Sequence, residues 1–381
     1  MEENKKPMGL YVHIPFCSKK CDYCDFVSYS MDRKAQQKYL AALFTEIDMV
    51  KRDFQDKVFN SIFIGGGTPS IVYEGFIASL ARKLFSSFHF EEKTEFTIEV
   101  NPSSFTREKF FEYVESGVNR ISVGVQCLDN KLLANHGRIQ SIENVQETFK
   151  ILSDSRFPNV NGDVMIGLPG QTESSVLETI KFLTKNNVKH ISCYTLQVEK
   201  YTMLYNKLQK GKIKPMPERT IININNKVAK YLDKLGFKRY EISNYAKPCF
   251  ECEHNKKYWD GTNYLGLGIS AHSYIGNYRF YNTKRLDTYI DAMNEGKTAV
   301  YSKEFIAKTE RRTERIMLAL RTKSGLNLEE FKKEFNEDIL LTKQHHIKKL
   351  KEMNMLEEVD GFLRIPQQHF SVSNSIILEL I

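Results

Sequence analysis

Apolar positions along the first two-thirds of the chain alternate between short continuous runs and runs with helical spacing. The short runs predict strands at residues 10–14, 61–64, 95–100, 120–126, 163–166 and 190–196. Apolar residues with helical spacing predict helices at residues 34–50, 71–84, 107–114, 142–152 and 173–183. Asp32, Thr106 and Thr172 stand where helix N-caps are expected. This alternation of strand and helix predicts a parallel sheet, either doubly wound or an incomplete (β/α) barrel.

The pattern changes in the last third of the chain. A long helix is expected at residues 218–235, then a strand-like segment at 239–242 and an irregular segment that holds Cys249, Cys252 and His254. Three further helices are expected at residues 311–322, 328–335 and 342–353. A hairpin follows, with strands at residues 356–359 and 362–365 and Asp360-Gly361 as its turn. These elements predict a small winged-helix-like module. We therefore expect three regions, at residues 1–240, 241–302 and 303–381.

Composition narrows the class of protein. The 381 residues are 41% apolar and 27% charged, which excludes a disordered or fibrous chain. No apolar run approaches the length of a membrane span, and residues 1–8 carry charges of both signs without an apolar core, so we expect a cytoplasmic protein. The net charge of +8 is too small for a nucleic-acid binder, although it is compatible with a peripheral position at an anionic membrane.

Three of the seven cysteines form the most specific motif of the sequence. Cys17-Ser-Lys-Lys-Cys21-Asp-Tyr-Cys24 directly follows the first expected strand. Three thiolates at this spacing can hold three irons of a [4Fe–4S] cluster and leave the fourth iron open for a small molecule. A structural zinc site is the alternative, but zinc requires four closed ligands and no fourth thiol follows nearby. The spacing therefore favours an iron–sulfur cluster.

Together with four other segments, this motif resembles the radical S-adenosylmethionine (SAM) superfamily. The segments are Tyr11-Val-His-Ile-Pro-Phe-Cys17, Gly65-Gly-Gly-Thr-Pro-Ser70, Ile166-Gly-Leu-Pro-Gly-Gln-Thr172 and His254-Asn-Lys-Lys-Tyr-Trp259. Within that superfamily they resemble the HemN/HemW group, which contains oxygen-independent coproporphyrinogen III oxidases and their haem-chaperone relatives. The resemblance covers nearly the whole chain. It implies a partial (β/α)6 radical-SAM barrel over residues 1–240, a connecting region and a C-terminal HemN-like module.

Polar residues gather at the expected carboxyl ends of the strands, where α/β folds bind ligands. Glu99 and Gln126 end the third and fourth strands, Asp163 lies on the fifth, and Gly66 and Gly67 follow the second. The resemblance implies that Cys17, Cys21 and Cys24 bind the cluster and that SAM is held by a set of surrounding residues. These are Tyr11, Tyr23, Gly66, Gly67, Thr68, Glu99, Gln126, Arg138 and Asp163. Members of the group usually carry His two residues after the arginine, where this chain has Gln140.

Two functions are compatible with the resemblance. A radical enzyme would cleave SAM and decarboxylate the propionates of coproporphyrinogen III, whereas a chaperone would bind haem and transfer it to an acceptor protein. Oxidases of the group carry a further Cys two residues after the third cluster ligand, and this chain has Phe26 there. That difference favours the chaperone. His254 then offers an imidazole to haem iron, and Tyr258 and Trp259 offer flat aromatic faces.

Two weaker signals concern metal and nucleic acid. Cys249, Cys252 and His254 form a Cys-x-x-Cys-x-His pattern, which could ligate a metal although no fourth ligand is evident. The basic stretch at residues 343–351 lacks interleaved aromatic residues for base stacking. We therefore expect no nucleic-acid partner, and we expect the C-terminal module to cover the open side of the barrel or to contact a protein.

Overall fold

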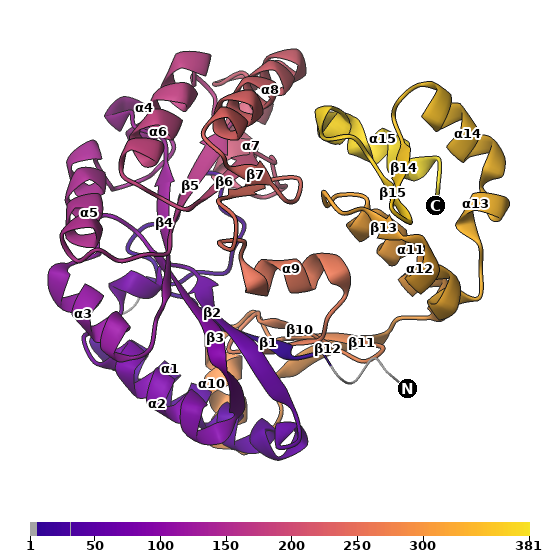
Figure 1. Ribbon diagram of the computed structural model, residues 1–381. Coiled ribbons are helices and arrows are strands. Elements are labelled where there is room, and N and C mark those ends of the chain that lie inside the picture. Colours follow the sequence, from indigo (N-terminus) through magenta and orange to yellow (C-terminus); the bar gives the residue numbers. More distant parts are fainter. Residues whose placement is uncertain (1–5, 31) are drawn as a thin grey trace.

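The expected apolar runs form parallel strands that lie side by side in sequence order. The structure is a computed structural model and describes residues 6–30 and 32–381 (Figure 1). The first five residues lie outside the described residues. They are part of the segment 1–8 from which a cytoplasmic protein was expected. The parallel strands are β1 (Met8–Ile14), β2 (Val58–Gly66), β3 (His89–Val100), β4 (Arg120–Gln126), β5 (Val160–Ile166) and β6 (His190–Thr195).

Further strands extend this sheet at both edges without closing it. Among the described residues, the sheet order runs from β12 through β1 to β7, and the two outermost strands do not pair with each other. The added strands are β9 (Tyr264–Leu267), β10 (His272–Ile275), β11 (Tyr278–Asn282), β12 (Val300–Phe305), β8 (Asn244–Ala246) and β7 (Lys238–Arg239). Because the parallel strands follow one another without a reversal of order, the prediction of an incomplete barrel is confirmed and the doubly wound alternative is wrong.

Helices line the outer side of this curved sheet (Figure 1). The helices of the barrel are α1 (Arg33–Val50), α2 (Phe76–Ser87), α3 (Arg107–Glu115), α4 (Asn130–Asn135), α5 (Ile142–Asp154), α6 (Glu173–Lys185), α7 (Met203–Gln209), α8 (Glu218–Lys234) and α10 (Leu286–Asn294). The side chains of Asp32, Thr106 and Thr172 accept hydrogen bonds from backbone N–H groups in the first turns of their helices, as predicted. No helix in the described part of the chain is both long and apolar enough to cross a membrane.

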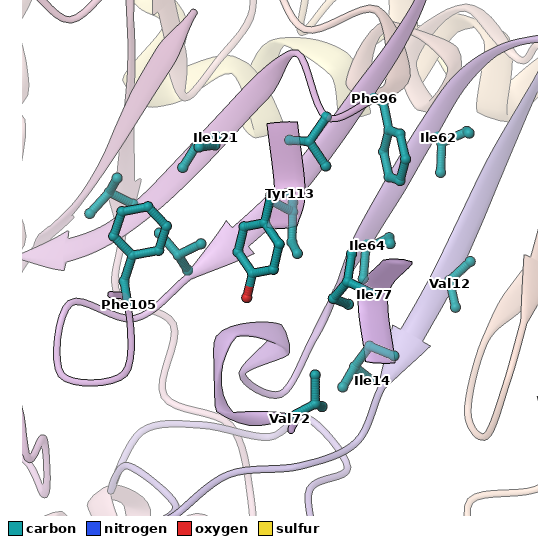
Figure 2. Packing of buried hydrophobic residues seen from close by; sticks show 14 of the residues in the cluster. Val12, Ile14, Ile62, Ile64, Val72, Ile77, Phe96, Phe105, Tyr113 and Ile121 are labelled. Carbon is teal, nitrogen blue, oxygen red and sulfur yellow. The ribbon is translucent and has the colours of Figure 1, made fainter. Parts of the chain in front are cut away.

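The barrel core lies between the strands and these outer helices. Figure 2 shows Ile62 and Ile64 of β2 and Phe96 of β3 close to Ile77 of α2 and Tyr113 of α3. All five side chains are buried. Burial of this apolar surface stabilises the sheet and fixes which polar side chains face the barrel interior.

A second, separate core belongs to the C-terminal module. Its elements are α11 (Lys308–Ala319), β13 (Leu326–Asn327), α12 (Leu328–Phe335), α13 (Ile339–Thr342), α14 (Gln344–Glu352), β14 (Glu357–Val359), β15 (Phe362–Arg364) and α15 (Ser373–Leu378). Asp360 and Gly361 both have positive φ, which is typical of the predicted hairpin turn. The limits of the three expected regions stay predictions, although the strands of 241–302 join the barrel sheet.

Several expected elements differ from the observed ones. The helix expected at 71–84 begins only at Phe76, because Gly75 adopts a left-handed conformation directly before it. Of the strand expected at 239–242, only Arg239 lies in a strand, β7; the Glu241 carboxylate accepts a hydrogen bond from Ser243 N in the turn that follows, and β8 begins only at Asn244. The helix expected at 342–353 is α14, and the short helix α13, which was not expected, directly precedes it.

The largest difference is α9 (Glu253–Asp260), which occupies the segment that the sequence predicted to be irregular. In Figure 1 this helix lies on the inner side of the curved sheet, apart from the outer helices. Its N-terminus is capped from another part of the chain: the carboxylate of Glu95 on β3 accepts hydrogen bonds from Glu253 N (2.9 Å) and His254 N (3.1 Å). A cap more than 150 residues away leaves no local signal, which explains the error.

Candidate functional site

The three motif cysteines lie on the loop between β1 and α1. One backbone hydrogen bond closes the base of this loop, from Cys17 N to Tyr29 O (3.0 Å), and a second holds its middle, from Asp22 N to His136 O (3.0 Å). The Asp22 carboxylate also forms an ion pair with Lys207, which lies on α7. The loop is therefore anchored at its base and in its middle, while its thiols stay partly accessible.

The three thiols have the accessibility and bonding state that a cluster requires. Cys17, Cys21 and Cys24 are half-buried and free of disulfides. Burial raises the pKa of the Cys24 thiol to about 11 and also raises the pKa of Cys17. Bound irons would favour the thiolate and reverse these shifts. Among the described residues no three Cys, His, Asp or Glu side chains converge closely enough to coordinate a metal ion, so the thiols share a loop but are not drawn together.

The glycine-rich turn after β2 packs directly against the cysteine loop. Gly67 N donates to Ile14 O (2.8 Å), Thr68 N donates to Phe16 O, and Thr68 Oγ1 lies 3.3 Å from Cys17 Sγ. A Cβ at Gly67 would lie 2.7 Å from Phe16 O, which is a clash with fixed backbone. The chain's own packing therefore requires glycine here, while contact of this turn with SAM stays a prediction.

Glu99, Gln126 and Asp163 all face the interior of the barrel from neighbouring strands. Burial raises the pKa of Glu99 to about 8, and the Asp163 charge adds to this shift. Glu99 Oε2 accepts a hydrogen bond from Gly66 N (3.2 Å). Asp163 is held by Ser122 Oγ (3.0 Å) and Asn161 Nδ2 (2.8 Å). These contacts leave part of each carboxylate's hydrogen-bonding capacity for a ligand.

Gln126 supplies an unsatisfied acceptor at the same place. Its side-chain oxygen is buried without a hydrogen-bond partner among the described residues, and its backbone φ is +66°. A buried polar atom without a partner costs free energy, and strained backbone of this kind gathers at binding sites. Both features fit a residue that completes its hydrogen bonds with a polar ligand such as SAM.

Arg138 connects this interior to the cysteine loop. Its guanidinium donates to Gly124 O (2.8 Å) and to Tyr23 OH (3.4 Å), and it lies 3.9 Å from Cys21 Sγ. The Gln140 side chain accepts from Arg138 and donates to Gly124 O and Val125 O, so it holds the arginine in place. On the other side of the interior, Tyr11 OH is hydrogen-bonded to His13 Nδ1 (3.0 Å). The sequence singled out Gln140 only as a departure, and the structure gives it a positioning role.

His254 is a residue of α9, and its side chain packs against the first two strands. It is only 1% exposed, and its Nδ1 is hydrogen-bonded to Ser61 Oγ (3.0 Å). Its Nε2 is hydrogen-bonded to Tyr258 OH (2.9 Å). Burial lowers the pKa of His254 to about 3, so the ring is neutral at physiological pH. Both ring nitrogens are engaged, so Tyr258 OH would have to move before His254 Nε2 could bind iron.

Tyr258 and Trp259 border a groove of about 910 Å³ between α9 and the C-terminal module. Tyr258 is 37% exposed, in contrast to His254 one helical turn before it. None of the SAM-site residues or the motif cysteines lines this groove. The aromatic pair of the His-Asn-Lys-Lys-Tyr-Trp segment therefore lines a groove that is separate from the cysteine loop and from the expected SAM residues.

The Cys249, Cys252 and His254 pattern is not assembled into a metal site in the described structure. Cys249 is exposed, whereas Cys252 is fully buried and donates to Glu95 Oε1 (3.3 Å). Glu95 was missed by the sequence analysis, since a lone carboxylate on a strand carries no signal for capping a helix far along the chain. The spacing of the three residues is instead a consequence of how α9 begins.

Replacing Glu95 should therefore loosen α9 as a unit. In Glu95→Ala, Glu253 N and His254 N lose their acceptor, and the free energy of unfolding should fall by about 2–3 kcal/mol. Chemical denaturation measures this change. Glu92→Ala, on an exposed part of the same strand, is the control and should change stability by less than about 0.5 kcal/mol. Equal stability of the two variants would contradict the cap.

Comparison with known proteins places the chain in a family. The model of the Radical SAM superfamily matches residues 11–183, and that of the HemN C-terminal domain matches residues 306–369. The heme chaperone HemW of Bacillus subtilis is 32% identical over 96% of this chain and 97% of its own length. This chain belongs to the HemW family. The HemW of Buchnera aphidicola from Schizaphis graminum is 38% identical over 71% of this chain and 70% of its own length.

A solved structure confirms the fold of this HemW-family chain. Coproporphyrinogen III oxidase (HemN) from Escherichia coli, described as a radical SAM enzyme, superposes with a TM-score of 0.85 over 99% of this chain and 90% of that chain. Their sequences are 22% identical, so the likeness establishes the fold alone. Membership of the radical SAM superfamily implies a [4Fe–4S] cluster and SAM as cofactors.

The half-buried polar residues of the interior lead to a binding prediction. Glu99→Ala, Gln126→Ala and Asp163→Ala should each weaken SAM binding about tenfold or more, because each removes a hydrogen-bonding group that the ligand would contact. The cluster should remain, since none of the three is a thiol. Anaerobic titration with SAM measures the affinity, and iron content is the control. Unchanged affinity in all three variants would refute the site.

Proposed function

We propose that this protein is a haem chaperone that binds haem and transfers it to an acceptor protein. In this proposal Cys17, Cys21 and Cys24 hold the [4Fe–4S] cluster, and exchangeable SAM contacts the residues around Glu99, Gln126 and Asp163. His254, Tyr258 and Trp259 belong to the haem site. The HemW relatives, identical at 32% over nearly the full length in Bacillus subtilis, support this function.

One structural observation carries the choice between chaperone and oxidase. Tyr258 and Trp259 face a groove that none of the cluster cysteines or the expected SAM residues lines. A radical enzyme must hold its substrate against the radical, within contact distance of the cofactor. A carrier has no such requirement, so an aromatic groove separated from the cofactor residues favours the carrier. The exposed Phe26, at the position where oxidases of the group carry Cys, agrees with this choice.

The location and partners follow from the same proposal. We expect the protein in the cytoplasm, with haem as its ligand and a haem-accepting protein as its partner. An acceptor at a membrane would place the chaperone peripherally at that surface, which the net positive charge favours electrostatically.

Anaerobic reconstitution with iron, sulfide and haem tests the function. The protein should acquire the spectra of both a cluster and a bound haem, and it should transfer haem to an apo-haemoprotein. Supplied with SAM, a reductant and coproporphyrinogen III, it should form no protoporphyrinogen IX. Formation of protoporphyrinogen IX at enzymatic rates would overturn the chaperone and favour the oxygen-independent coproporphyrinogen III oxidase.

A further inference from the structure

The first backbone N–H groups at the start of α9 are bound by side chains from other parts of the chain. Glu253 N and His254 N donate to the Glu95 carboxylate on β3. The preceding Cys252 N donates to Tyr240 OH (3.3 Å), and Cys252 gives the helix no side-chain cap of its own. The N-terminal end of α9 therefore depends on where the Tyr240 hydroxyl group is held, a residue that lies between β7 and β8.

From Tyr240 a continuous chain of hydrogen bonds leads through the barrel to the expected SAM site. Tyr240 OH is hydrogen-bonded to His190 Nε2 (2.8 Å), and His190 Nδ1 is hydrogen-bonded to Asn161 Oδ1 (2.7 Å). Asn161 Nδ2 then donates to the carboxylate of Asp163 (2.8 Å). His190 and Asn161 are almost completely buried, so water does not compete for their hydrogen bonds. The chain connects a carboxylate of the barrel interior to the start of α9.

With Asp163 ionised, each hydrogen bond of this chain has a defined direction. The carboxylate can only accept, so the Asn161 amide turns its nitrogen towards Asp163 and its oxygen towards His190. That oxygen also only accepts, which assigns the proton to His190 Nδ1 and leaves Nε2 as an acceptor. Burial lowers the pKa of His190 well below its ordinary value, so the ring is neutral. Tyr240 OH therefore donates to Nε2 and offers its oxygen to Cys252 N.

The same helix carries the candidate axial ligand of haem. His254 Nε2 is hydrogen-bonded to Tyr258 OH (2.9 Å), so Tyr258 must move away before His254 can bind iron. A ligand that fixes the start of α9 in its present position stabilises this closed arrangement relative to the open one. SAM that is hydrogen-bonded to Asp163 is such a ligand, because it fixes the far end of the chain.

We propose that His190 and Tyr240 are positioning residues that couple the SAM site to α9, so that bound SAM weakens haem binding. This inference rests on the function proposed above, with Asp163 at the SAM site and His254 at the haem site. SAM holds Asp163 and, through the chain, keeps α9 in the arrangement in which Tyr258 OH is hydrogen-bonded to His254. Linkage then requires haem to weaken SAM binding by the same factor. Binding of SAM thereby favours release of haem to the acceptor.

Titrations with both ligands test the coupling in the full-length, cluster-reconstituted protein. Haem is titrated with and without saturating SAM, and SAM with and without haem. In the wild type each ligand should raise the dissociation constant of the other about fivefold. This factor should fall to about one in Tyr240→Phe, which lacks the hydroxyl group. It should also fall to about one in His190→Leu, which interrupts the chain but leaves Tyr240 OH on Cys252 N.

The neighbouring strand β8 supplies a matched control. Tyr245 OH is buried and has no hydrogen-bond partner among the described residues, so Tyr245→Phe removes a hydroxyl group without breaking the chain. This variant should keep the fivefold effect. Thermal unfolding shows which variants are folded, and Tyr240→Phe carries the test if His190→Leu is not.

Hydrogen exchange provides a second measurement that does not involve haem. SAM should slow amide exchange at Cys252, Glu253 and His254 in the wild type and in Tyr245→Phe. It should have no such effect in Tyr240→Phe or His190→Leu, where the start of α9 is no longer connected to Asp163.

The remaining outcomes contradict defined parts of the proposal. A wild type whose haem affinity is unchanged or raised by SAM would overturn the coupling. Coupling that persists in a folded His190→Leu protein would overturn the route through this chain, and so would its loss in Tyr245→Phe. Absence of haem binding by the wild type would instead refute the chaperone function, while hydrogen exchange would still decide whether SAM acts on α9.

Discussion

A Cys17→Ala protein, reconstituted anaerobically with iron and sulfide, is expected to hold almost no cluster. With three protein thiolates for four irons, one iron is already open, and loss of one thiolate leaves two irons without a protein ligand. The same loss is expected for Cys21→Ala and Cys24→Ala. Iron and sulfide content and the visible absorption of the cluster measure the effect.

Matched controls come from cysteines outside the loop. Cys127 and Cys193 are buried in the barrel, and Cys249 is exposed on a separate segment. Cys127→Ala, Cys193→Ala and Cys249→Ala should each retain the full chromophore. A Cys17→Ala protein with a full complement of iron and sulfide would show that the ligand assignment is wrong.

His254→Ala is expected to shift the Soret band and to weaken haem binding by about tenfold or more, whereas Trp259→Ala should weaken binding with a smaller spectral change. An axial imidazole sets the haem spectrum, while a tryptophan beside the macrocycle contributes apolar contact. The cluster should be unaffected in both variants, since it lies on a separate loop. Haem titrations followed by absorption spectroscopy measure both effects.

The hydrogen bond between His254 and Tyr258 provides a sharper test. Tyr258 OH is hydrogen-bonded to His254 Nε2, the atom that would bind iron. Tyr258→Phe removes this hydrogen bond and frees the nitrogen. If His254 is the axial ligand, Tyr258→Phe should keep the Soret position and bind haem at least as tightly as the wild type. A lost or shifted Soret band in Tyr258→Phe, with an unchanged band in His254→Ala, would assign the iron to Tyr258 instead.

Local patterns in the sequence were sufficient for the elements of the barrel. The apolar runs of β1 to β6 and the caps at Asp32, Thr106 and Thr172 are short-range features, because strand and helix periodicities and N-cap hydrogen bonds involve neighbouring residues. The Cys17–Cys24 spacing is local in the same sense. The winged-helix-like hairpin at Asp360-Gly361 was predictable because its turn demands positive φ at both central residues.

Periodicity could not decide whether the sheet is doubly wound or an open barrel. That choice depends on strand order, and strand order is a property of pairing between segments far apart in sequence. Motif resemblance pointed to the barrel, and the consecutive pairing of β1 to β6 established it.

The structure of the region around α9 was decided only by tertiary contacts. The segment from Cys249 to Trp259 contains no side-chain cap of its own, so its helix depends on Glu95 of β3. The same long-range packing buries His254 between Ser61 and Tyr258 and turns Tyr258 and Trp259 towards the C-terminal module. The sequence by itself determined which residues carry the chemistry, since cluster and aromatic motifs are local in spacing. Which of their atoms are free to bind a ligand depends on α9 and its packing, which rest on Glu95 and Ser61 more than 150 residues away, and no local pattern records such contacts.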